Sequence, residues 1–166
     1  MRIRNLFNLG FQLTPACLLL SILVSNLIGQ TPSPNKIDEF FHLPCDDYLG
    51  RMDAMFSQAD SNPNSTIYLI VYEGKERRYN AKRKRTELIL PKFGTATAKF
   101  RSIKTYARWR RFPVDRIKFV SGGFRENLTV EIWLAPAGAE PPKPTPTMNK
   151  MKYGKGKPVG FCTDCC

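Results

Sequence analysis

Hydrophobic residues recur at helical spacing in two stretches of the chain. Between Cys45 and Asp60 the apolar side chains follow one another at steps of one, three, three, one and three residues, which predicts an amphipathic helix. A second stretch from Thr95 to Arg111 carries an apolar stripe on one side and a strongly basic face, starting at Lys99, on the other. A proline follows each stretch closely and ends the helix. We therefore expect two helices, each with one face against a core.

Shorter apolar runs predict β-strands. From Thr66 to Tyr72 the chain is almost continuously β-branched or aromatic, which predicts a central strand that is buried on both faces. Residues 116–120 and 128–134 predict two further strands. Between them, two consecutive glycines at positions 122 and 123 predict a tight turn.

The order of these elements is helix, strand, helix, strand, strand, which predicts a small two-layer sandwich of the α+β or α/β class. A strand, a crossing helix and a second strand form a parallel unit, to which the last strand adds antiparallel through the glycine turn. We expect about three strands in this sheet and two helices against it. Residues 88–90 add a short strand or a docking segment.

Polar and proline-rich segments lie on both sides of the predicted domain. We expect a linker at residues 30–44 and the α/β domain at residues 45–136. Residues 137–166 are rich in proline, lysine and glycine and end in a cluster of cysteines. This composition predicts a disordered, extended tail.

The first 29 residues have the organisation of a signal peptide. A start with two arginines precedes an apolar run from Cys17 to Ile28, and small Gly29 follows. The run is shorter than the roughly 20 apolar residues that span a membrane. We therefore expect cleavage after Gly29 and export to the periplasm, the cell envelope or the extracellular space. The alternative is an uncleaved helix that anchors the domain to the membrane.

Four cysteines follow the predicted signal, namely Cys45, Cys162, Cys165 and Cys166. An oxidising compartment permits disulfides among them, and three full pairings are possible. A bond from Cys45 to one tail cysteine would hold the tail against the start of the domain. The alternative is a thiol-redox or metal-handling protein that uses the C-terminal Cys-x-x-Cys-Cys. Redox motifs usually lie at a helix start, and these cysteines are too few for a zinc site, so we expect no metal and no cofactor.

The chain is strongly basic, with 26 Lys and Arg residues against 14 Asp and Glu residues. Loss of residues 1–29 removes two arginines, so the net charge stays near +10. Such a charge favours anionic partners, and we expect peptidoglycan, lipopolysaccharide or acidic lipid rather than nucleic acid because the protein is exported. The predicted binding residues lie in one loop and on one helix face, and are Lys82, Arg83, Lys84, Arg85, Arg101, Lys104 and Arg108. The alternative is a solvated surface without a partner.

No arrangement of residues in the sequence indicates catalysis. His42 is the single histidine and has no nucleophile motif beside it. The carboxylates Asp46, Asp47 and Asp53 lie together on the first predicted helix, whereas the two acids of a glycosidase face each other across a cleft. We therefore expect a non-catalytic protein with a binding role or, as an alternative, a structural or assembly role.

Part of the chain resembles a family of secreted bacterial proteins to which no activity is assigned. The resemblance rests on RIKFVSGGFRENLTVEIWLAPAGAEPPKPTPT, residues 116–147, and on the Asn-Pro-Asn-Ser-Thr segment at residues 62–66 before the first predicted strand. It covers roughly residues 45–147. It implies a fold and an exported location, but no activity.

The element order is more remotely similar to that of OmpA-like peptidoglycan-binding domains. That family binds the diaminopimelate of the wall peptide through an aspartate in a T-D-x-x-G loop and an arginine in an N-R-R-V segment. Here the first loop, at residues 72–75, contains no aspartate, and residues 125–130 lack the arginine pair. The similarity therefore implies a fold and not this ligand chemistry.

Overall fold

A computed structural model describes residues 31–162. The elements below all belong to one compact unit that starts at Pro32. The predicted export signal at residues 1–29 lies outside the described residues, as do Cys165 and Cys166. The elements in chain order are β1 (Asn35–Phe40), α2 (Cys45–Asp60), β2 (Thr66–Asn80), β3 (Arg85–Ile89), α3 (Thr95–Trp109), the 3-10 helix η1 (Val114–Arg116), β4 (Ile117–Asn127) and β5 (Thr129–Ala135).

The long strand β2 is the centre of a five-stranded sheet. It pairs antiparallel with β5 and parallel with β4, while β1 pairs antiparallel with the free edge of β5. Beyond this region β2 continues and forms an antiparallel hairpin with β3. The α+β class is therefore correct, and the parallel pair on either side of α3 is as predicted. The expectation of about three strands was too low.

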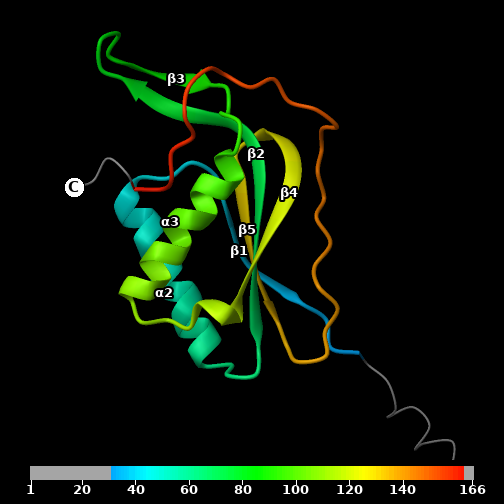
Figure 1. Ribbon diagram of the computed structural model, residues 1–166. Helices are drawn as coiled ribbons and strands as arrows, with labels where there is room; N and C mark the ends of the chain where they lie inside the picture. Colours follow the sequence, from blue (N-terminus) through cyan, green and yellow to red (C-terminus); the bar gives the residue numbers. More distant parts are fainter. Residues whose placement is uncertain (1–30, 163–166) are drawn as a thin grey trace, which may run out of the picture. The chain divides into compact units, whose positions relative to one another are not determined.

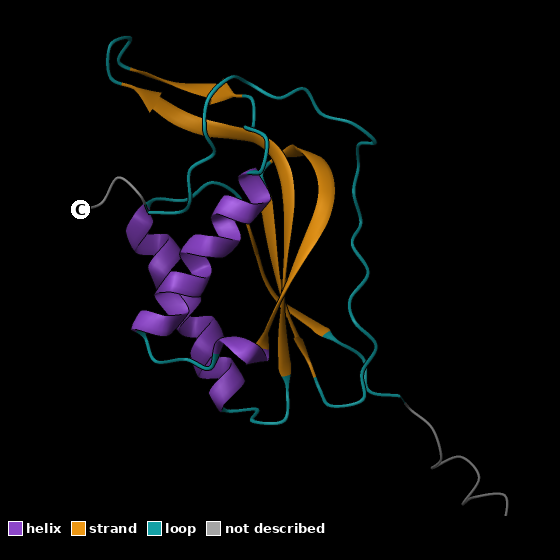
Figure 2. Ribbon diagram, viewed as in Figure 1, coloured by secondary structure: helices purple, strands orange, loops and turns teal. Residues whose placement is uncertain are grey.

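Both helices cover one face of the sheet (Figures 1 and 2). Ile67, Leu69 and Val71 alternate along β2, and their side chains join the same buried core as Met52 of α2 and Ile103 of α3. The helical spacing of the apolar residues thus produces the packed layer that it predicted. Of the intervening residues, Ile70 is fully buried and Tyr68 is partly buried, as expected for a central strand.

β1 lies inside the segment that we expected to be a linker. It contains mostly polar residues and is largely exposed, but Ile37 and Phe40 contact the core. An edge strand of this kind needs only one partner, β5, so its sequence carries little alternation of apolar and polar positions. The packed region consequently starts before residue 45.

The predicted glycine turn is also corrected by the structure. Gly122 and Gly123 lie within β4, which continues to Asn127. A side chain at Gly122 would start 2.5 Å from a ring carbon of Tyr72, so glycine is needed for close contact with this ring and not for a turn.

The chain then crosses over β2 at Gly74. An ideal Cβ at Gly74 would lie 2.5 Å from the carbonyl oxygen of Asn127 and 2.6 Å from that of Arg125. The Leu128 amide donates a hydrogen bond to the Lys75 carbonyl at 3.0 Å. β5 therefore pairs with the edge of β2 opposite to β4. Our prediction that β5 follows β4 through a tight glycine turn and pairs beside it is wrong.

Residues 137–162 are packed against the domain, so the prediction of a disordered tail is wrong for them. The proline-rich part runs along the sheet on the side away from the helices (Figure 1). The Thr145 amide donates a hydrogen bond to the Tyr72 hydroxyl at 3.0 Å, and the Thr147 and Met148 amides donate to the Phe124 carbonyl. An extended proline-rich chain has few amides to satisfy, so it can lie on a surface through a small number of hydrogen bonds.

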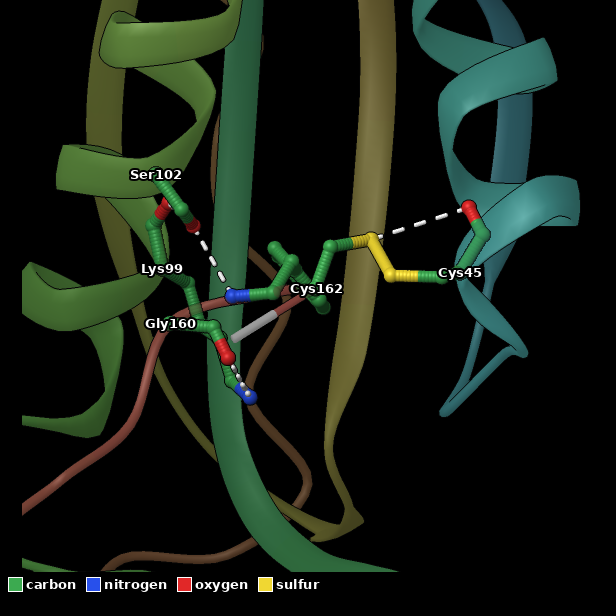
Figure 3. Close-up of a disulfide and its surroundings, with 6 residues drawn as sticks. Cys45, Lys99, Ser102, Gly160 and Cys162 are labelled. Carbon is green, nitrogen blue, oxygen red and sulfur yellow. Dashed lines mark hydrogen bonds between the residues drawn. A yellow bond between two sulfur atoms is a disulfide. The ribbon is translucent and has the colours of Figure 1, made fainter. Parts of the chain in front are cut away.

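The chain then returns to the helices, where a disulfide joins Cys162 to Cys45 across a sequence separation of 117 residues (Figure 3). The Phe161 ring stacks on Tyr48 with centroids 4.4 Å apart, and the Phe161 amide donates to the Ser102 hydroxyl at 2.9 Å. This pairing is of the kind considered from the sequence, in which Cys45 holds a cysteine of the C-terminal segment.

Replacement of Gly74 by alanine tests the crossing of the chain over β2. The new Cβ would overlap the backbone of residues 125–127, so Gly74→Ala should lower the free energy of unfolding in urea by about 3 kcal/mol or more. The control is Gly50→Ala in α2, where no atom lies within 4 Å of the ideal Cβ. This control should raise stability by about 0.5–1 kcal/mol. Equal stability of Gly74→Ala and the parent would contradict the crossing.

Removal of the disulfide tests how the C-terminal segment is held. The double variant Cys45→Ser and Cys162→Ser should lose about 3–5 kcal/mol of unfolding free energy, because the bond closes a loop of more than 100 residues. Guanidinium denaturation measures the loss. Limited proteolysis should then cut residues 137–162 first. The parent protein treated with a reducing agent should show the same loss of stability and the same early cleavage. An unchanged cleavage pattern would show that the segment is held without the bond.

Candidate anion-binding surface

The far end of β2 and the strand β3 form a hairpin that extends past the helices (Figure 1). In this hairpin, residues 76–80 of β2 pair with residues 85–89 of β3. Residues 81–84 form the turn, in which the Arg83 amide donates to the Asn80 side chain at 3.2 Å and Lys84 has a left-handed φ of 50°. We call residues 76–89 the basic hairpin.

The basic hairpin gathers cations on a projecting element. Six of its residues are basic and exposed, namely Arg77, Arg78, Lys82, Arg83, Lys84 and Arg85. Its acidic residues are Glu76 and Glu87. Glu76 is buried and accepts a hydrogen bond from the buried Lys99 ammonium at 3.1 Å. One acidic group, Glu87, is therefore left to balance the exposed cations of the hairpin.

Glu87 lies beside the turn and orders two of these cations. Its carboxylate accepts hydrogen bonds from Arg85 at 2.8 Å, from Asn80 at 3.1 Å and from Arg83 at 3.0 Å. These hydrogen bonds, the one from Arg85 above all, lower the pKa of Glu87 to about 2. The carboxylate therefore stays ionised at any pH of biological interest. Among residues 31–162, neither Lys82 nor Lys84 forms an ion pair.

The two faces of the basic hairpin differ. Because side chains alternate along a strand, Arg78 and its cross-strand partner Glu87 share a face with Glu76, whose ion pair with Lys99 directs that face toward α3. The opposite face carries Arg77, Tyr79, Thr86 and Leu88. We call this second set the outer face.

The predicted helix residues lie on a different element from the hairpin. Arg101, Lys104 and Arg108 follow one another along α3; Arg101 and Arg108 are exposed, whereas Lys104 is half-buried with its ammonium 5.4 Å from the centre of the Phe119 ring. Lys99, which we expected on the same basic face, is buried against β2. The predicted binding set is thus divided into a compact group at the hairpin and a sparser row on the helix.

Two buried carboxylates that the sequence did not reveal, Glu131 and Glu73, have structural partners. The Glu131 carboxylate, only 3 % exposed, accepts hydrogen bonds from Trp133 and Tyr72 at 3.0 Å and from Arg125 at 2.7 Å. Burial opposes ionisation, but these hydrogen bonds outweigh it and lower the pKa of Glu131. A fully bonded carboxylate of this kind holds neighbouring strands together.

Glu73 has a similar role at the start of α3. Its carboxylate accepts a hydrogen bond from the Ala96 amide at 2.8 Å, which satisfies one of the free N–H groups at the helix N-terminus. Its other oxygen accepts a hydrogen bond from the Tyr153 hydroxyl at 2.7 Å. Nothing in the local sequence around Glu73 indicates these contacts, because both partners are distant along the chain.

Two further kinds of feature are absent from the described residues. Within residues 31–162, no group of three or more His, Cys, Asp or Glu side chains is placed to hold a metal ion. Neither helix of this region is both long and apolar enough to span a bilayer.

Replacement of Glu87 tests whether the hairpin cations attract anions. Glu87→Gln removes the one acidic group that neutralises Arg83 and Arg85. It should strengthen binding to vesicles that contain anionic lipid about fivefold at low salt, because each charge contributes about 1 kcal/mol near such a surface. Co-sedimentation measures the change. The exposed Glu140 lies in the C-terminal segment, and Glu140→Gln makes the same change in net charge there; equal effects of the two variants would contradict a local role of the hairpin.

The basic hairpin cannot be compared with a known binding site. No protein-family model matches the chain, and no curated protein or solved structure is significantly similar to it. The resemblance to secreted bacterial proteins and to OmpA-like domains therefore stays a prediction.

Proposed function

We propose that the protein is a non-catalytic exported protein of the cell envelope or extracellular space that binds an anionic envelope component. The observation that carries this proposal is the basic hairpin, on which six exposed cations are balanced by one acidic side chain. Peptidoglycan, lipopolysaccharide and acidic lipid all have the complementary charge.

The strength of such a contact follows from the number of charges. Each Lys or Arg contributes about 1 kcal/mol near an anionic surface, so Lys82, Arg83, Lys84 and Arg85 together account for substantial affinity. Salt should weaken the contact, because exposed charges are screened beyond about 10 Å at 0.1 M ionic strength. Arg101, Lys104 and Arg108 on α3 are expected to add less, since they are spread along the helix.

The hairpin is also held in a fixed position. This favours binding, because little conformational entropy is lost when the hairpin meets its partner. β2 is continuous from the centre of the sheet into the hairpin. The buried pair of Glu76 and Lys99 fixes the base of the hairpin to α3. Loss of one partner from such a pair leaves an uncompensated buried charge, so the hairpin cannot easily leave its position.

The cysteine chemistry supports this proposal over the thiol-redox alternative. Cys162, the first cysteine of the C-terminal Cys-x-x-Cys-Cys, is bonded to Cys45. While this bond is present, Cys162 cannot form a redox pair with another cysteine of the motif. A structural clamp accounts for the bond, because the adjacent Phe161 is packed in the core.

Replacement of Lys82, Arg83, Lys84 and Arg85 by serine tests the proposed function. The variant should lose nearly all salt-sensitive retention on purified peptidoglycan and on anionic vesicles, because about 4 kcal/mol of electrostatic attraction is removed. The matched control replaces four exposed lysines of the C-terminal segment, namely Lys143, Lys150, Lys152 and Lys155. Retention that is unchanged in the hairpin variant, or reduced equally in both variants, would overturn the proposal.

A further inference from the structure

The outer face of the basic hairpin carries apolar side chains as well as cations. Tyr79 is 63 % exposed and Leu88 is 57 % exposed, and neither belongs to the hydrophobic core of the described residues. Arg77 pairs directly with Leu88 across the two strands, and Tyr79 is the diagonal neighbour of Leu88 on the same face. A projecting element thus presents an aromatic ring and a leucine beside a guanidinium group.

Exposed apolar residues on a projecting turn do not improve the binding of a dissolved polyanion. A polymer offers charge and hydrogen-bond acceptors, so it leaves Tyr79 and Leu88 in water. The surface of a bilayer offers both charged headgroups and an apolar interior. Tyrosine rings favour the headgroup level. Long cationic side chains reach the phosphates while their stems lie along apolar groups. Apolar residues flanked by Lys and Arg are the pattern of proteins that lie in this interface.

We infer that the outer face of the basic hairpin docks on the surface of a bilayer that contains anionic lipid. Tyr79 and Leu88 enter the interface, while Arg77 and the exposed turn lysines Lys82 and Lys84 contact the headgroups. This inference rests on the proposed function and names its partner.

The distribution of acidic groups agrees with this orientation. Glu87 pairs with Arg78 on the face directed toward α3, and Glu76 is buried against Lys99. No acidic residue of the hairpin therefore lies on the face that would meet the negative headgroups. The acidic groups of the hairpin are thus confined to the face directed toward α3.

The test uses the full chain and the double variant Tyr79→Ser and Leu88→Ser, which keeps every cation. Binding is measured by co-sedimentation with vesicles of phosphatidylglycerol and phosphatidylcholine, and separately by affinity for heparin as a soluble polyanion. The apolar double variant should bind the anionic vesicles about tenfold or more weakly than the parent. Its affinity for heparin should change less than twofold, and its thermal unfolding should match that of the parent because both side chains are exposed.

The matched control is Trp109→Ser, which removes an aromatic side chain of similar exposure, 71 %, at the end of α3 farther from the Lys99 contact with the hairpin. It should bind the vesicles as the parent does. Vesicle binding that is lost with the turn cations but kept in the apolar double variant would overturn this inference and leave the proposed function standing. Binding of heparin without binding of vesicles would also overturn it in favour of a polymer. Binding that neither hairpin variant alters would overturn the proposed function itself.

Discussion

At Gly74 the carbonyl oxygens of Arg125 and Asn127 lie where any side chain would begin. This close crossing brings the chain from one edge of β2 to the other, so a single strand has hydrogen-bond partners on both edges up to that point. Beyond Lys75 the pairing of β2 with β4 and β5 has ended, and β2 continues with β3 as its partner. The projecting hairpin is therefore a direct consequence of where the chain can cross.

The crossing also explains why so many charges are compatible with a stable domain. Before Gly74 the residues of β2 are largely buried and mostly apolar, whereas after it they are mostly polar and include the exposed Arg77 and Arg78. Glu73 and Glu76 lie at the transition, and each has a partner in α3. The helix that covers the sheet thus also fixes the base of the hairpin.

Local patterns predicted the parts of this fold that depend on local chemistry. The helix from Cys45 to Asp60 and the buried strand that starts at Thr66 follow directly from the spacing of apolar residues. The missed parts depend on distant contacts. β1 is a polar edge strand, and Gly122 is required by the Tyr72 ring, which no pattern around the glycine reveals.

The candidate site was predictable to a similar extent. The basic run from Lys82 to Arg85 is visible in the sequence, and the structure places its first three residues in one turn and Arg85 at the start of β3. The burial of Lys99 was not predictable, because its spacing on α3 matches that of the exposed basic residues and its partner Glu76 lies on another element. The pairing of Leu88 with Arg77 on one face similarly requires the register of the hairpin.

The C-terminal segment shows how a sequence without apolar periodicity can still be ordered. Ordering each residue costs about 1–2 kcal/mol of conformational free energy, while each hydrogen bond to Tyr72 or Phe124 returns only about 1 kcal/mol. These contacts are too few to hold the segment alone. The bond from Cys162 to Cys45 lowers the entropy of the unfolded chain and so reduces this cost. Since disulfides persist in oxidising compartments, order in this segment fits the proposed export.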